Sequence, residues 1–374
     1  MSNQKKILIF HLHSNGDCLY ATAIARQIKT DYPGCHLTWG VASFCKSILE
    51  NNPFIDQIWE IPGVNKSNST DIHRKLKKEI YQKKKEGVYD EIFFTQLIDE
   101  NLANYDGCIR SGIFRGYNKP ITVDITPVLR LYPHEKENAE KFAIEHNLKK
   151  YKNIILFEFA PQSAQLAITD EIALDIAQKL TEDGKTAVIL SSAKTIKSEN
   201  IAIIDGSTLS LRETAALTFY CTHLLGCSSG ISWLATSDAA KMLAMVQVLD
   251  PYSPWVNPMS RDFERFGIST SQLIELYDNN AATIINCMLE VLNGDFDEVK
   301  KKYYQHLPLH FIGTSRGIYN MLCFLQFKAI IKHIRINVSV FGFHPKLIFA
   351  VANGILTAPF KLLKNTYKKR VLKA

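Results

Sequence analysis

Short apolar runs alternate with amphipathic segments throughout residues 1–298 of the chain. The runs have the length of buried strands, and the apolar residues between them recur every three to four positions, as on one face of a helix. In the first half, the predicted strands are Lys6–Leu12, His36–Val41, Gln57–Ile61 and Tyr89–Thr95. The predicted helices are Asp17–Thr30, Ser43–Asn51 and Asp71–Glu86. Because strands that alternate with helices pair in parallel through crossover connections, this half is predicted to be an α/β unit.

The alternation restarts after a helix predicted at Glu135–His146, which indicates a second unit of the same kind. Its predicted strands are Asn153–Ala160, Lys185–Leu190, Ile201–Ile204, His223–Gly226 and Lys241–Val248. Its predicted helices are Thr169–Glu182, Leu209–Cys221, Ser229–Asp238 and Ala281–Asn293. A chain of 374 residues is long enough for two such units and an extension. The predicted domains are residues 1–150, 151–298 and 299–374.

Residues 299–374 differ from the rest in charge. Glu298 is the last acidic residue, and fourteen Lys or Arg residues follow it, so the remainder of the chain carries −7 against +7 overall. Apolar and basic residues mix here at helical spacing, and the longest uncharged stretch, Leu347–Phe360, is shorter than the roughly 20 residues that span a bilayer. Three interpretations compete: binding to an anionic membrane surface, packing back onto the two units, and binding to an acidic partner, including nucleic acid. The interleaved Phe, Leu, Ile and Lys favour the membrane surface.

Two turns stand out because ligands of doubly wound sheets bind at the carboxyl ends of strands. The first is His13–Asp17, after the first strand, where Gly16 is the only glycine and no dinucleotide fingerprint is present. Asp17 can cap the following helix, which the residues alone favour, or act as a general base. The second is Gly226–Ile231, which suits either a phosphate held by backbone N–H groups or a tight turn with Ser228 or Ser229 as N-cap.

These segments resemble a known family. Ile7–Ile61, Ser207–Leu217 and Leu225–Ala235 are similar to the heptosyltransferase-like family 9 of glycosyltransferases, and the resemblance extends over Lys6–Asn293. It implies the GT-B fold, in which two Rossmann-like lobes with parallel sheets face each other across a cleft. It also implies inverting, metal-independent transfer of a sugar from a nucleotide-sugar donor to a hydroxyl of a surface glycan, such as a lipopolysaccharide core.

The resemblance assigns roles by position. Asp17 matches the catalytic base, and the turn Ser229–Ile231 matches the segment that holds the donor diphosphate. The full predicted donor set is Gly16, Gln162, Ser163, Ser192, Ser228, Ser229, Gly230 and Ile231. Asn15, Arg110 and Arg115 are predicted on the acceptor side, where the two arginines suit an anionic acceptor or a solvated loop. Arg261 and Arg265 are candidates for extra phosphate-binding charge.

This chain departs from the family at four places. Ser228 and Trp233 stand where the family has Asp and His, Pro161–Gln165 has no Lys or Arg, and Ser191–Lys194 has no ribose-binding acid. These departures leave the sugar and nucleotide open, and they keep a non-catalytic binding or scaffold protein as the alternative function.

The remaining expectations concern partners and location. We expect no metal or cofactor, because His11 and His13 have no third ligand at a familiar spacing, and we expect no nucleic acid as partner. The expected partners are a nucleotide-sugar, a lipid-linked or phosphorylated glycan, and an anionic membrane bound through residues 299–374. The N-terminus resembles no signal peptide, and eight cysteines without a C-x-x-C pair suit a reducing compartment, so we expect a cytoplasmic protein peripheral to the inner face of the membrane.

Overall fold

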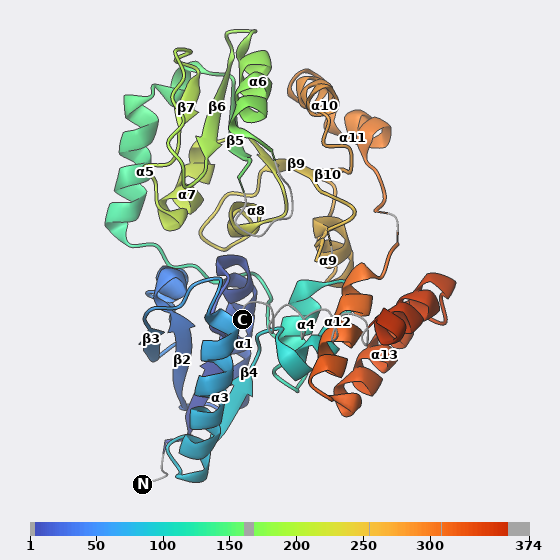
Figure 1. The fold of residues 1–374 in the computed structure, drawn as a ribbon. Helices are drawn as coiled ribbons and strands as arrows, with labels where there is room; N and C mark the ends of the chain where they lie inside the picture. Colours follow the sequence, from blue (N-terminus) through green and yellow to red (C-terminus); the bar gives the residue numbers. More distant parts are fainter. Residues whose placement is uncertain (1–3, 161–167, 254, 308, 358–374) are drawn as a thin grey trace, which may run out of the picture.

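The computed structural model describes residues 4–160, 168–253, 255–307 and 309–357, and two parallel β-sheets organise it (Figure 1). The first sheet has the order β3-β2-β1-β4. Its strands are β1 (Lys6–Phe10), β2 (His36–Ala42), β3 (Gln57–Ile61) and β4 (Glu91–Phe94). In register, Ile7 of β1 lies opposite Leu37 of β2 and Glu91 of β4. We call this sheet and its helices the first lobe, which includes α1 (Asn15–Asp31), α2 (Lys46–Leu49), α3 (Ser69–Lys85) and α4 (Ile109–Arg115).

The second sheet has the order β10-β9-β8-β5-β6-β7, and every pairing in it is parallel. Its strands are β5 (Asn153–Glu158), β6 (Thr186–Ser191), β7 (Ile203–Asp205), β8 (His223–Gly226), β9 (Ala244–Val248) and β10 (Leu273–Leu276). The helices of this second lobe are α5 (Pro133–Glu145), α6 (Asp170–Thr181), α7 (Leu211–Leu217), α8 (Gly230–Leu234), α9 (Met259–Arg265) and α10 (Ala281–Asn293). The prediction of an α/β fold with two parallel sheets is confirmed.

Local boundaries differ from the predicted ones where polar residues interrupt the apolar pattern. The helix predicted at Ser43–Asn51 is a 3₁₀ turn, Ser43–Cys45, followed by the short α2, and the helix predicted at Ser229–Asp238 ends at Leu234. Strand β10 was not predicted, because its four residues include Glu275, which is buried. Helices α4 and α9 were not predicted either, whereas the strands and helices that were predicted stand where the hydrophobic pattern indicated.

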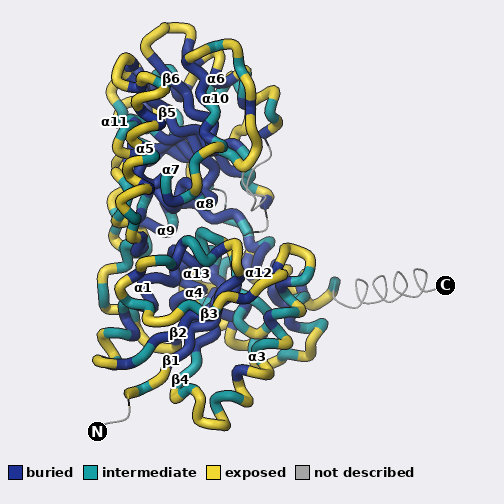
Figure 2. Tube along the Cα trace, turned by 90° about the vertical axis from the view of Figure 1, so that its left-hand side faces the viewer, coloured by how far each residue is buried: buried dark blue, intermediate teal, exposed yellow. Residues whose placement is uncertain are grey.

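The two lobes share one continuous apolar core, and buried residues run through both sheets in Figure 2. Helices α1 and α8 meet at the boundary, where the rings of Tyr20 and Trp233 pack edge to face with centroids 4.8 Å apart. Arg212 of α7 makes a further contact between the lobes. It is buried, forms an ion pair with Glu135 of α5, and donates to the carbonyl of Ser47 in α2 at 2.8 Å. The lobes are therefore joined by packing as well as by the chain.

The chain returns to the first lobe after the second sheet is complete (Figure 1). Helix α11 (Phe296–Tyr303) packs beside α10, and α12 (Ile312–Cys323) and α13 (Phe327–Phe341) pack on η2 (Asp99–Asn104), a 3₁₀ segment of the first lobe. The buried amide of Asn337 donates to the Tyr105 carbonyl at 3.1 Å. Residues 345–357 form a further helix. Helix α11 thus packs on the second lobe, and α12 and α13 pack on the first. Packing back onto the two units was one of the three interpretations of the basic segment.

None of the helices among the described residues is long and apolar enough to cross a membrane.

Met321 tests the packing of α12. Its side chain is fully buried against Ala103 and Ile330, so Met321→Ala should lower the free energy of unfolding by about 2–5 kcal/mol. The control is Ile331→Ala on the exposed side of α13, which should change it by less than about 0.5 kcal/mol. Equal effects of the two variants in urea unfolding would contradict the packed arrangement.

Candidate functional site

The first candidate turn leads from β1 into α1 and is held by a residue from another strand. Gln96, which follows β4, accepts hydrogen bonds from the backbone N–H groups of Leu12 and His13 at 2.8 and 3.1 Å, and its own amide donates to the His13 carbonyl. Ser14 has a φ of 76°, in the region that non-glycine residues rarely adopt. Gln96 was not singled out from the sequence, and it fixes the backbone that presents Asn15, Gly16 and Asp17.

Asp17 lies in the first turn of α1 and is partly buried. Burial raises the pKa of its carboxyl to about 7. No hydrogen bond from any described residue reaches that carboxylate, and Ser14 occupies the N-cap position, so the structure gives Asp17 no capping bond. The neighbouring Asn15 Oδ1 is buried and also lacks a partner among the described residues. A carboxyl that titrates near neutral pH therefore stands beside an unsatisfied acceptor.

The second candidate turn leads from β8 into α8, and it too contains a serine with positive φ, Ser228 at 53°. The backbone N–H of Ser228 donates to Gln247 Oε1 at 2.6 Å, and its hydroxyl donates to the Asn257 carbonyl. The indole N–H of Trp233 donates to the Ser228 carbonyl at 3.1 Å. Trp233 stands where the family that the sequence resembles has His, and here its hydrogen bond to Ser228 stabilises this turn.

Glu158, the last residue of β5, occupies the amino-terminal end of α8. Its carboxylate accepts from the backbone N–H groups of Ile231 and Ser232 at 3.1 Å each, and from the hydroxyls of Ser229 at 2.5 Å and Ser232 at 2.7 Å. Glu158 is buried. A negative group at a helix amino terminus is electrostatically favoured, and here the chain supplies that group itself.

This arrangement bears on the predicted donor set. The backbone N–H groups of Ser229, Gly230 and Ile231 were predicted to hold a diphosphate, and in this structure the N–H of Ile231 and the hydroxyl of Ser229 are bonded to Glu158. Gly230 differs, because a Cβ built on it would meet no atom of the described residues within 4 Å apart from its chain neighbours, and the same holds for Gly16. The two glycines therefore leave space beside the backbone of both turns. The sequence did carry a signal for Glu158, which is the one charged residue in the otherwise apolar run Asn153–Ala160.

The structure places Arg110 between the lobes. Its side chain is 1% exposed, its Nε lies 3.1 Å from Asp262 Oδ1, and its guanidinium stacks over the rings of Tyr20 and Trp233 at 4.8 and 5.5 Å. Burial raises the pKa of Asp262 to about 6, although Arg110 opposes that rise. Arg110 was predicted to contact an acceptor; its enclosure gives it an interlobe contact instead.

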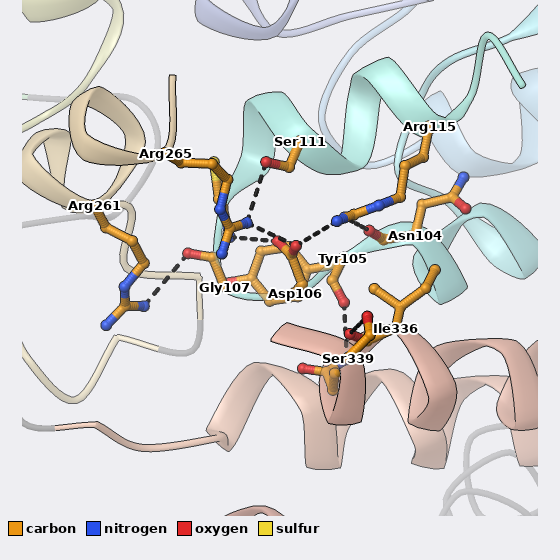
Figure 3. A network of polar contacts seen from close by, with 12 residues as sticks. Asn104, Tyr105, Asp106, Gly107, Ser111, Arg115, Arg261, Arg265, Ile336 and Ser339 are labelled. Atoms are coloured by element: carbon orange, nitrogen blue, oxygen red, sulfur yellow. Dashed lines mark hydrogen bonds and ion pairs between the residues drawn. The ribbon is translucent and has the colours of Figure 1, made fainter. Parts of the chain in front are cut away.

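Three further arginines gather around the loop before α4 (Figure 3). The buried Asp106 accepts from Arg115 Nη2 at 2.7 Å and from Arg265 Nη1 at 2.6 Å, and Arg261 Nη1 donates to the Gly107 carbonyl at 3.4 Å. Arg265 is thereby engaged away from the α8 turn, and Arg261 lines a small cavity together with His310 of the segment before α12. Arg115 is partly exposed, so its predicted acceptor contact stays a prediction.

The other predicted residues are less informative. Gln162 and Ser163 lie outside the described residues. The Ser192 hydroxyl closes a local turn with the backbone of Lys194, at 2.9 and 3.0 Å.

His11 is buried, bonds to Thr95 at 2.9 Å, and burial together with the nearby His13 lowers its pKa to about 3. In the described parts of the chain, no group of three or more His, Cys, Asp or Glu side chains could hold a metal ion.

No protein-family model and no curated protein matches this sequence. Solved structures do match its fold. A glycosyl transferase of family 9 from Veillonella parvula is 15% identical, with a TM-score of 0.53 over 78% of this chain and 91% of its own. ADP-heptose lipopolysaccharide heptosyltransferase II of E. coli is 13% identical, with a TM-score of 0.50 over 77% of this chain and 98% of its own. The chain thus has the two-lobed fold of these glycosyltransferases, as predicted.

The pair Arg110–Asp262 gives a pH-dependent test of the lobe boundary. Arg110→Met leaves the Asp262 carboxylate buried without its partner, which should cost about 3–5 kcal/mol of unfolding free energy at pH 8. Below pH 6 the carboxyl takes up a proton in the wild type as well, so the difference between the two proteins should shrink. Chemical unfolding at pH 8 and pH 5 measures both values, and an equal loss at the two pH values would refute the buried pair.

Proposed function

We propose that this protein is a glycosyltransferase that moves a sugar from a nucleoside diphosphate donor to a hydroxyl of a surface glycan, with inversion and without a metal. The observation that carries the proposal is the state of Asp17. Its carboxyl has a pKa of about 7, accepts no hydrogen bond from the described residues, and lies on the helix that packs against α8. The likeness in fold to the two glycosyltransferases agrees with this reaction class.

In the proposed reaction, the Asp17 carboxylate takes the proton from the acceptor hydroxyl as its oxygen bonds to the anomeric carbon. The bond from that carbon to the diphosphate breaks, and the diphosphate leaves with the electron pair. Attack on the face opposite the leaving group inverts the anomeric centre. A base with a pKa near the working pH is efficient in such a step. Asn15 Oδ1 would accept a hydrogen bond from the acceptor and help to orient it.

The donor is proposed to approach the open backbone at Gly230 and Gly16, with Ser192 and Ser228 on the surrounding loops. A diphosphate that also reaches Ser229 and Ile231 must displace Glu158, because two anions do not share one set of donors. We propose a lipid-linked or phosphorylated glycan as acceptor, at the inner face of the cytoplasmic membrane.

The occupation of the α8 terminus by Glu158 also favours a second candidate, a non-catalytic protein that keeps the fold and binds a partner. In such a protein the amides of Ile231 and Ser232 would need no ligand, because Glu158 satisfies them permanently. The two functions differ in whether a nucleotide-sugar binds.

Thermal unfolding with ADP-, GDP-, UDP- and CMP-sugars separates the two candidates. A ligand at 100 times its dissociation constant should add about 2.7 kcal/mol of stability. We expect one nucleotide class to raise the melting temperature, and we expect Glu158→Gln to enlarge that rise, because it removes the charge that repels the diphosphate. If no nucleotide-sugar shifts either protein, the non-catalytic function stands.

Asp17→Asn should have opposite effects on turnover and on stability. Loss of the base should lower kcat by about 10²- to 10⁴-fold while the donor-induced thermal shift survives. The pKa of Asp17 is about 7 in the folded protein and near 3.8 in the unfolded chain. The wild type therefore loses stability as the pH rises from about 4 to about 7, and the full loss is present above pH 7. Since one pKa unit corresponds to about 1.4 kcal/mol, the variant should be more stable than the wild type at pH 8 by up to about 4 kcal/mol, and the two proteins should be equally stable near pH 4.

Asp124→Asn is the matched control, because hydrogen bonds from Thr126 lower the pKa of that exposed carboxyl. Its removal should reduce stability at pH 8 and leave turnover unchanged. The wild-type rate should rise with pH through about 7 as Asp17 ionises. An Asp17→Asn variant with full turnover, or a rate that does not fall in acid, would exclude Asp17 as the base.

A further inference from the structure

The helix at residues 345–357 is apolar on two opposite sides. It begins at Pro345, after a turn in which the Lys346 N–H donates to His344 Nδ1 at 3.1 Å. Proline suits the first position of a helix, where its missing N–H has no partner to lose. The helix contains a single charged residue, Lys346. At 1.5 Å per residue it is about 20 Å long, shorter than the roughly 30 Å hydrocarbon core of a bilayer.

Its inner side packs tightly on α12. Leu347 and Ala350 are buried with Phe311, and the Asn353 amide donates to Ser315 Oγ at 3.2 Å. A Cβ on Gly354 would come within 2.8 Å of the Ser315 carbonyl, so only glycine permits this approach. These close contacts of the inner side fix the rotation of the helix about its axis. They therefore determine which side of the helix faces solvent.

The opposite side, which we call the outer face, consists of six exposed apolar residues: Pro345, Ile348, Phe349, Ala352, Ile355 and Leu356. Their spacing of three, one, three, three and one positions places them along one side of a helix. Phe349 is 74% exposed and Leu356 is 68% exposed, and Phe343 in the preceding turn is 81% exposed. An apolar strip of this kind on a soluble protein indicates a binding surface.

The charges that residues 299–357 contribute are all positive. Arg316 of α12 and Lys346 are exposed, and no acidic residue follows Glu298 anywhere in the sequence. A hollow of about 180 Å³ between α12 and this helix is lined by Arg316 together with the polar side chains of Ser315, Asn353 and Thr357. An apolar strip with basic residues at its borders complements a surface that is anionic outside and apolar just beneath.

We propose that the outer face of residues 345–357 docks on an anionic lipid bilayer. The helix lies in the interface, Phe349 and Leu356 enter the boundary between headgroups and acyl chains, and Arg316 meets a lipid phosphate at the hollow. A second copy of the chain is a poorer occupant, because a two-fold contact would bring the basic residues of both copies together. The inference deepens the proposed function by naming the surface that meets the membrane, but lipid binding does not depend on sugar transfer.

The test compares full-length proteins on vesicles of phosphatidylcholine alone and of phosphatidylcholine mixed with equal parts of phosphatidylglycerol. The wild type should sediment with the anionic vesicles. Phe349→Ser/Leu356→Ser should weaken that binding about tenfold or more, because both residues lose their apolar insertion. Arg316→Glu/Lys346→Glu should weaken it on anionic vesicles and reduce its dependence on salt. Deletion of the whole basic segment is unsuitable, because α12 and α13 cover part of the first lobe.

The matched control is Ile201→Ser/Phe219→Ser, which removes two apolar side chains of the second lobe that are 77% and 62% exposed. It should bind vesicles as the wild type does. The inference is overturned if the wild type does not bind anionic vesicles, or if the control loses as much binding as Phe349→Ser/Leu356→Ser. It is also overturned if the wild type is a dimer and Phe349→Ser/Leu356→Ser dissociates that dimer, since the outer face would then contact a second copy of the chain. A nucleotide-sugar thermal shift that persists in that variant would separate failure of the docking surface from failure of the proposed function.

Discussion

Charges withdrawn from water at the lobe boundary constrain the whole molecule. Asp262 of α9 has Arg110 of α4 as its ion-pair partner, and Asp106 of the first lobe has Arg265 of the second. Each pair has one partner in each lobe. If the lobes separated, a buried charge would lose its ion-pair partner, which costs free energy because the interior has a low dielectric constant. The aromatic contact of Tyr20 with Trp233 lies in the same boundary and holds α1 beside α8. The relative position of the two candidate turns therefore follows from this buried ionic layer.

The hydrophobic pattern was sufficient to predict the strands because each forms a short, nearly continuous apolar run in a sheet buried on both sides. It could not reveal β10, where Glu275 breaks the run. It did predict that Asp17 lies at the start of the helix after the first strand, because that position depends only on neighbouring residues. The residues that hold the turns could not be found in this way. Gln96 bonds to backbone 83 and 84 positions away, and Glu158 bonds to Ile231 73 positions away. Such contacts depend on which strands become neighbours, and no local periodicity encodes them.

Glu158 and Glu275 show the same physical solution at two places. Each stands in a strand, is buried, and accepts bonds from the first turn of a short helix: Glu158 from α8, and Glu275 from the backbone N–H of Ser260 in α9 at 3.2 Å. A short helix gains little stability from its own hydrogen bonds. The hydrogen bonds to a carboxylate at its amino terminus therefore contribute much of the stability of that helix. The family resemblance predicts a donor diphosphate at the α8 turn, and in this structure the carboxylate of Glu158 stands at that helix end.

The return of α13 to the first lobe has a consequence for biosynthesis. Asn337 bonds to the Tyr105 carbonyl across 232 residues, and His333 reaches Ala103 across 230. A chain folds from its amino terminus as it leaves the ribosome, so the η2 surface of the first lobe stays uncovered until α13, more than 200 residues later, has been made. Contacts of such sequence separation also form slowly. The first lobe is thus finished last, and a nascent chain that stalls within the second lobe would present that uncovered surface to chaperones.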